Sequence, residues 1–155
     1  MYSRILVATD LSECADAALL AAATLARSQG GEVHVCTALG SPREPLVMGS
    51  SALQQQHLET ELQEAQHHLR QKLSANGFAD IEHRVHIFRH LPGEEIPRAA
   101  WRLDCDLIVI CSKGGSGIRR FGLGSVAEHI LANARVPVLV VPPKVRVRTT
   151  THSAS

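Results

Sequence analysis

The chain has 155 residues, enough for one domain with a proper core, which excludes two full catalytic domains. Lys and Arg total 16 against 15 Asp and Glu, and the resulting formal charge of +1 excludes a strong phosphate-backbone footprint, so no nucleic-acid partner is expected. Aromatic residues make up only 3% and hydrophobic residues 45%, so the interior must be built from Val, Ile, Leu and Ala, which favours a buried aliphatic sheet.

Membrane segments and a secretion signal are not evident in the sequence. No apolar run approaches the roughly 20 residues that cross a bilayer, and the first residues lack the basic and apolar regions of a secretory signal. We therefore expect a cytoplasmic protein without membrane insertion. The cysteines fall inside helical or strand-like segments, so we expect reduced thiols at Cys14, Cys36, Cys105 and Cys111.

The first half of the chain predicts two strand–helix units. Residues 4–9 are a short aliphatic run that suits a strand buried on both faces, and the Ala- and Leu-rich segment 13–29 predicts a helix. Residues 32–38 predict a second strand, and the Gly- and Pro-containing segment 39–50 predicts a loop. Apolar residues then recur every three to five positions over 53–73, which predicts a long amphipathic helix lying on the sheet.

Two further strands and a short helix are predicted next. Residues 81–88 alternate apolar and polar side chains, which predicts a strand at an exposed edge of the sheet. Residues 93–103 predict a short helix, with Pro97 tolerable only near its first turn. Residues 106–111 predict a fourth strand, and a glycine-rich loop follows over 112–124.

The last part of the chain completes the alternation. A helix is expected from Ser125 to about Ala134, and a fifth strand at a sheet edge over 137–141. Four strand–helix units and a final strand require right-handed crossovers, so we predict an α/β fold: a three-layer sandwich with a five-stranded parallel sheet between helices. This domain should span 1–143. Residues 144–155 are expected to form a frayed tail or, alternatively, an edge strand for a partner chain.

Three features meet at the carboxyl ends of the predicted strands, where open parallel sheets bind their ligands. Asp10 ends the first strand, the loop over 112–124 follows the fourth strand, and Ser125 begins a helix. Unpaired N–H groups and the positive end of the dipole at that helix start favour a phosphate. Residues without a Cβ let main-chain donors approach phosphate oxygens closely. The loop glycines are Gly114, Gly115, Gly117, Gly122 and Gly124.

The loop and the helix start resemble a motif of the universal stress protein family. The ATP-binding members of that family carry a Gly, two residues, a second Gly, nine residues, and then Gly-Ser or Gly-Thr. In this sequence Gly114, the nine residues after it and Gly124-Ser125 match the pattern, while Cys111 replaces the first glycine. The resemblance covers nearly all of residues 3–142.

The resemblance implies a fold, an assembly and a ligand. The fold is a Rossmann-like α/β sandwich of the adenine nucleotide alpha hydrolase-like type, which forms a homodimer through the last strand, 137–141. The ligand is ATP with Mg²⁺, and the role is that of a stress-response regulator acting on an unknown protein partner. No catalytic residue and no protein ligand for a metal is expected.

The motif also implies roles for individual positions. Asp10 would contact the adenosine moiety, and Thr37 and Ala38 would line the adenine pocket. Two loop glycines would shape the phosphate loop, and the helix start would hold phosphates. A cation at Lys113 could neutralise a triphosphate. The candidate cofactor-binding residues are Thr9, Asp10, Thr37, Ala38, Lys113, Gly114, Gly117, Gly124, Ser125 and Val126.

Alternatives to this hypothesis remain at the level of the protein and of single residues. The protein could be a nucleotide-independent dimeric interaction module, or a slow ATPase or phosphotransferase, although residues 112–125 offer no Asp, Glu or His as a general base. Cys111 is either a packed small hydrophobe or a reactive thiol, and its side chain could narrow the pocket. Arg119 and Arg120 either neutralise phosphate or are solvated surface charges.

Other functional patterns fit the sequence poorly. Residues 122–127 match G-x-G-x-x-A, but no acid follows about twenty residues later, and the P-loop sequence is absent. His83 and His86 would point to opposite faces of one strand, which argues against a zinc centre. No nucleophile elbow surrounds Ser125, which argues against a serine hydrolase.

Overall fold

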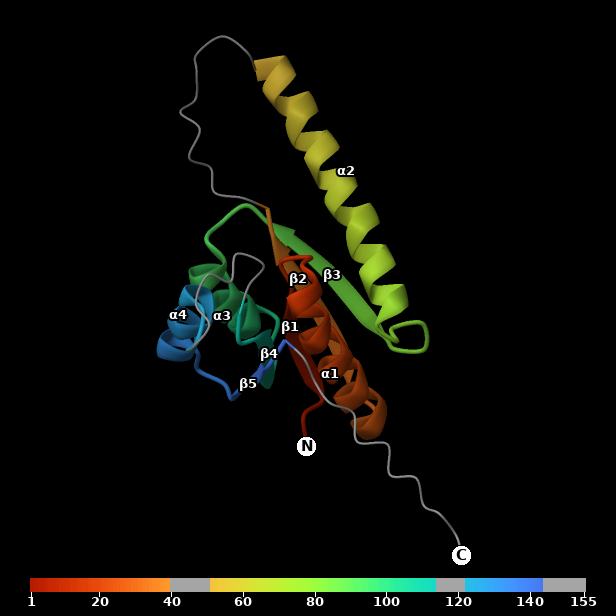
Figure 1. The fold of residues 1–155 in the computed structure, drawn as a ribbon, viewed down its shortest axis with the longest axis vertical. Coiled ribbons are helices and arrows are strands. Elements are labelled where there is room, and N and C mark those ends of the chain that lie inside the picture. The colour runs from red at the N-terminus through yellow and green to blue at the C-terminus, as the bar shows by residue number, and fades with distance from the viewer. Residues whose placement is uncertain (40–50, 114–121, 144–155) are drawn as a thin grey trace, which may run out of the picture.

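A computed structural model describes residues 1–39, 51–113 and 122–143. Strands and helices alternate within these residues, and the strands form one parallel sheet in the order β3-β2-β1-β4-β5, which confirms the predicted fold class (Figure 1). The strands are β1 (Arg4–Ala8), β2 (Glu32–Ala38), β3 (His83–Phe88), β4 (Leu107–Cys111) and β5 (Val138–Val141). The helices are α1 (Glu13–Gln29), α2 (Ser51–Ala75), α3 (Pro92–Arg102) and α4 (Ser125–Asn133).

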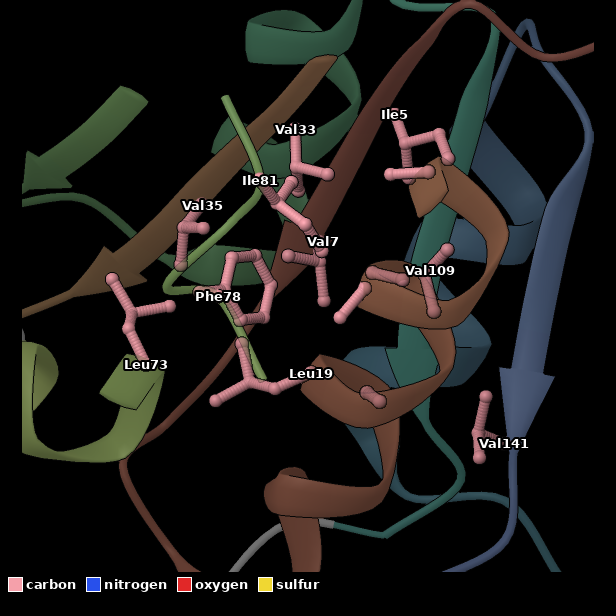
Figure 2. Close-up of a cluster of buried hydrophobic side chains, with 14 of the residues drawn as sticks. Ile5, Val7, Leu19, Val33, Val35, Leu73, Phe78, Ile81, Val109 and Val141 are labelled. Carbon is pink, nitrogen blue, oxygen red and sulfur yellow. The ribbon is translucent and has the colours of Figure 1, made fainter. Parts of the chain in front are cut away.

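α1 covers one face of the sheet through small side chains. Ala18, Ala22 and Ala23 are fully buried, and their size lets the helix lie close to the central strands. Aliphatic side chains of β1, β2 and β4 meet them, and the ring of Phe78 lies in this core between Leu73 and Leu19 and the strands (Figure 2). Burying one such Val, Leu, Ile or Phe side chain stabilises the fold by roughly 1.5–3 kcal/mol.

α3 and α4 cover the opposite face of the sheet (Figure 1). Leu6 and Ile108 project from the central strands into a second core, where Ala99 and Ile130 from the two helices are fully buried. Alternate residues of β1 and β4 therefore serve two different cores. This is the three-layer arrangement predicted from continuous apolar strands.

The prediction that α2 lies on the sheet is correct only for the C-terminal half of the helix. Leu69 and Leu73 are buried in the α1 core, whereas Leu53 is 73% exposed. The helix has 25 residues and is roughly 37 Å long, while β3, the edge strand nearest to it, has 6 residues and is roughly 20 Å long. The N-terminal half of α2 consequently projects beyond the sheet (Figure 1).

Several element ends differ from the predictions by one or two residues. β1 ends at Ala8 because the side chain of Thr9 is already part of a turn, and β3 begins at His83 because Ile81 bonds back to Phe78. As predicted, β3 is an edge strand, but the expected single wet face is wrong, because His83, Arg84 and Val85 are all exposed and the last three residues of the strand are half-buried. The expected loop over 39–50, except Leu39, and the expected tail lie outside the described residues.

Among the described residues, no helix combines the length and apolar content that a membrane span requires.

Candidate functional site

A cavity of about 460 Å³ opens at the carboxyl ends of β1, β2 and β4. The chain leaves β1 through α1 on one face of the sheet and leaves β4 through α4 on the other face. This reversal of direction between two neighbouring strands separates the loops and leaves a crevice. The volume lies within the roughly 300–1,000 Å³ of small-molecule pockets.

The candidate residues predicted from the sequence converge on this cavity. The structure describes all of them except Gly114 and Gly117, which lie outside the described residues, as do Arg119 and Arg120. Every described candidate lines the cavity. They are Thr9, Asp10, Thr37, Ala38, Lys113, Gly124, Ser125 and Val126.

The turn after β1 fixes the first side of the cavity. The N–H of buried Thr9 donates to the carbonyl of Cys36 at 2.9 Å, and its Oγ1 accepts the N–H of Leu11 at 3.0 Å. Leu11 has a φ of 66°, which turns the chain sharply toward α1. The Asp10 carboxylate accepts hydrogen bonds from the N–H and the hydroxyl of Ser12, so it is oriented before any ligand arrives.

The end of β2 forms a second wall. Thr37 is 3% exposed and Cys36 is fully buried, and both line the cavity with Ala38. Burial raises the pKa of the Cys36 thiol far above its usual range, so this side chain is a neutral packing group. The wall is therefore mostly apolar, with one hydroxyl, which suits the face of a planar ring.

The start of α4 gives the cavity its donors. Gly124 is the N-cap residue, its N–H donates to the Ser112 carbonyl at 2.8 Å, and no side chain of the described residues caps the helix. The N–H groups of Ser125 and Val126 belong to the first turn, which has no intrahelical acceptors. Both residues are exposed at the cavity, so the positive end of the helix dipole is open to an anion.

Cys111 lines the cavity but its thiol is engaged elsewhere. Its Sγ donates to the carbonyl of Cys14 on α1 at 2.9 Å, and burial raises the pKa of this thiol. Both observations favour the packed interpretation over the reactive one. The cavity remains open although this position carries a side chain where the family motif has glycine.

Several lining residues were missed by the sequence analysis. Pro92 and Ile96 come from α3, and Ile130 comes from the buried face of α4. No local pattern distinguishes them from ordinary core residues, because they reach the cavity only through packing of helices on the sheet. Glu128 also lines the cavity, three residues beyond the segment searched for a general base. Its place in the first turn of α4 was a usable signal.

The histidines form a pair that the sequence did not suggest. His34 Nδ1 and His86 Nε2 lie 2.9 Å apart on neighbouring strands, and the two rings stack. His83 instead meets the edge of the Phe78 ring, so His83 and His86 serve different faces, as predicted. Within the described part of the chain no three His, Cys, Asp or Glu side chains gather into a metal site.

Comparisons with known proteins agree on one family. The sequence model of the Universal stress protein family matches residues 1–142. A universal stress protein of Methanocaldococcus jannaschii is 32% identical over 147 residues, covering 91% of this chain and 82% of that protein. A universal stress protein of Synechocystis is 29% identical, and the matched region covers 90% of this chain and 97% of that protein.

Solved structures share the fold over almost their whole length. Hypothetical protein MJ0577 superposes with a TM-score of 0.78 at 28% identity, covering 94% of this chain and 99% of its own. A universal stress protein of Archaeoglobus fulgidus, solved in complex with dAMP, superposes with a TM-score of 0.65 at 26% identity and covers 90% and 98%.

Proposed function

The chain belongs to the universal stress protein family, and from that premise we propose that it binds ATP with Mg²⁺ and acts as a regulator in the stress response. One observation carries the proposal: the first turn of α4, which no side chain of the described residues caps, opens into a largely apolar cavity at the strand ends. An adenine nucleotide needs both features, an apolar slot for its ring and main-chain donors for its phosphates. The complex of the Archaeoglobus fulgidus relative with dAMP supports the choice of an adenine nucleotide.

The proposal assigns one role to each side of the cavity. Thr37 and Ala38 flank the adenine, and the oriented carboxylate of Asp10 bonds the adenosine moiety. The N–H groups of Ser125 and Val126 hold phosphate oxygens, and Gly124 keeps the approach free of a side chain. The cation of Lys113, Thr9 beside Asp10, and the loop glycines Gly114 and Gly117 complete the site.

The residues at the cavity also fit Mg²⁺. This ion prefers oxygen ligands and usually keeps several waters, with one or two carboxylates and the phosphates of the nucleotide. Asp10 and Glu128 provide carboxylates at the cavity, and Ser112 and Ser125 provide hydroxyl oxygens. A magnesium ion bound with the nucleotide would neutralise phosphate charge. Because phosphates and waters supply most of its ligands, the magnesium ion would not need three protein side chains to hold it.

The proposal includes a cytoplasmic homodimer. β5 is an edge strand of the sheet formed by the described residues, and Leu139 on it is 38% exposed, so the strand can offer main-chain groups and apolar area to a second copy. All four cysteines of the chain are free thiols in the structure, which suits the reducing cytoplasm. In the alternative of a nucleotide-independent module, the dimer would be the whole functional unit.

Glu128 keeps the second alternative, a slow ATPase, under consideration. A carboxylate at the phosphate end of the cavity can accept a proton from an attacking water. The alternative requires phosphate release from ATP that exceeds the release by a Gly124→Val variant and that Glu128→Gln abolishes. If the wild-type protein releases phosphate no faster than the Gly124→Val variant does, the protein binds ATP without hydrolysing it.

The experiment that tests the proposal is thermal unfolding with and without Mg-ATP. A ligand at 100 times its Kd stabilises the folded state by about 2.7 kcal/mol, which raises the Tm by several degrees in a chain of this size. Gly124→Val should abolish the shift, because Val at the N-cap covers the first-turn donors. Gly124 has a φ of −66°, a backbone conformation that is open to Val.

Ala75→Val is the control, since it also introduces a Val side chain, but at an exposed position at the end of α2. It should shift with Mg-ATP as the wild type does. Mass spectrometry of small molecules released from the purified, denatured protein identifies the nucleotide. The proposal fails if millimolar Mg-ATP leaves the wild-type Tm unchanged.

A further inference from the structure

A second hollow lies on the α3–α4 layer, separate from the nucleotide cavity. It has a volume of about 640 Å³ and shares no lining residue with that cavity. We call it the α3–α4 groove. Its chemistry is carried by Glu94, Arg98, Trp101, Arg102, His129 and Arg135.

The spacing of these residues explains why they gather. One face of α3 carries Glu94 and, four, seven and eight residues later, Arg98, Trp101 and Arg102. The opposite face of α3, with Ile96 and Ala99, is buried in the core. The groove face is therefore the outer face of an amphipathic helix, bordered by His129 of α4.

The groove is cationic and its cations are largely uncompensated. Among the described residues, neither Arg98 nor Arg135 forms an ion pair, whereas Arg102 donates to Oε1 of buried Glu95 at 2.6 Å. The acid in the lining, Glu94, lies in the first turn of α3, where the helix dipole already stabilises its charge. Two guanidinium groups thus remain for carboxylates supplied by a ligand.

The tryptophan adds an anchor of a different kind. Trp101 is the single Trp of a chain with 3% aromatic residues, and it is 71% exposed. Trp and Arg are enriched in the hot spots of protein interfaces, and this groove places an exposed indole next to arginines. An apolar or aromatic side chain of a ligand can pack on its face while the arginines pair with charges beside it.

We propose that the α3–α4 groove docks an acidic peptide segment of a partner protein. A single-stranded nucleic acid fits less well, because it needs several successive stacking platforms and this groove offers one indole. The carboxylate of Glu94 can accept a hydrogen bond from a peptide N–H, a donor that a phosphodiester backbone does not offer. The docking does not require a bound nucleotide, since the two lining sets are separate.

The test is a random 12-residue peptide library displayed on phage and selected on the full chain without nucleotide. We expect sequences rich in Asp and Glu with one apolar or aromatic residue. A selected peptide, synthesised with blocked ends, is then titrated while the fluorescence of Trp101 is followed, which reports on the groove because the chain has no other Trp.

Substitutions distinguish the groove from the rest of the surface. Arg98→Glu and Arg135→Glu should each weaken the Kd at least tenfold, and Trp101→Ala, measured by calorimetry, should do the same. Arg70→Glu is the matched control, because Arg70 is exposed on α2 and has no ion pair within the described residues. It should change the Kd less than twofold.

Four results would overturn the docking proposal. Selected sequences that lack an excess of Asp and Glu, or that bind Arg98→Glu and Arg70→Glu equally, exclude the groove as their site. Binding of an oligothymidylate that requires Arg98 and Arg135 would assign the groove to nucleic acid. Conversion of a dimer to a monomer by Arg98→Glu would assign it to a second copy. A failure of ATP binding affects none of these measurements.

Discussion

Glu128 places a carboxylate at the α4 end of the cavity, where the phosphates are proposed to bind. It is exposed in the first turn of α4, where its carboxylate shares the helix start with the donors proposed for the phosphates. In EDTA, Glu128→Gln should therefore tighten ATP binding about two- to fivefold, because removing one partly screened like charge is worth about 0.5–1 kcal/mol. Calorimetric titration measures the change.

Glu64→Gln on the exposed face of α2 is the control for a general change in net charge, and it should leave the ATP affinity unaltered. Weaker ATP binding by Glu128→Gln in EDTA would contradict the repulsion argument. It would show that the carboxylate accepts a hydrogen bond from the nucleotide.

The cavity residues differ in how directly the sequence indicates that they line the site. Asp10 could be predicted because it ends a buried strand and the ends of parallel strands meet at one edge of the sheet, whereas Thr37 and Ala38 were predicted through the resemblance to the family motif. Ile96 could not be predicted, because it reaches the cavity through packing of α3 on the sheet. Whether the predicted residues bind a nucleotide stays a prediction until a ligand is measured.

At the scale of elements, α2 shows where periodicity stops being informative. Its apolar repeat runs through the whole helix, but the sheet is long enough to cover only its C-terminal half. Periodicity reports which face of a helix is apolar and not how much of that face finds a partner. The alternation of strands and helices, in contrast, predicted the sheet and its layers, since few topologies accommodate it.

The two halves of α2 should differ sharply in their contribution to stability. Leu69→Ala should lower the free energy of unfolding by about 2–5 kcal/mol, because Leu69 is 1% exposed in the α1 core. Leu53→Ala should change it by less than about 0.5 kcal/mol, because the side chain is 73% exposed. Urea unfolding of both variants measures this. Equal losses would contradict the position of the projecting half.

The β2–β3 pair carries a pH dependence. Burial lowers the pKa of His86, and the positive charges of His34, Arg84 and Arg102 add to this effect. His34 also contacts Glu32 at 3.4 Å. At His86 the unfolded chain therefore binds a proton more readily than the folded chain as the pH falls below about 6.5, the ordinary pKa of His. The stability that neutral His86 contributes is present above that pH and is lost as the pH falls.

Replacing His86 tests this direction. The Tm of His86→Gln should depend less on pH between 7.5 and 5.5 than the Tm of the wild type. His67→Gln, at an exposed position of α2, should retain the wild-type dependence. A steeper loss of stability in His86→Gln at low pH would contradict the assigned sign.

For the whole molecule, the same two helices border both proposed binding surfaces. α3 and α4 present one set of side chains to the nucleotide cavity and another set to the α3–α4 groove. A ligand that shifts either helix would therefore affect the other surface, and the coupling would be equal in both directions. β5 lies at the edge of the sheet formed by the described residues, so the proposed dimerisation and the proposed nucleotide binding would use different parts of the fold.

The central claim is that the start of α4 holds the phosphates of ATP through its main-chain N–H groups, and a crystal structure grown with excess Mg-ATP tests it most directly. The account predicts phosphate oxygens within about 3.2 Å of the N–H groups of Ser125 or Val126. It also predicts the adenine between the ends of β1 and β2. A cavity closed by the side chain of Cys111, or a nucleotide bound elsewhere, would contradict the account.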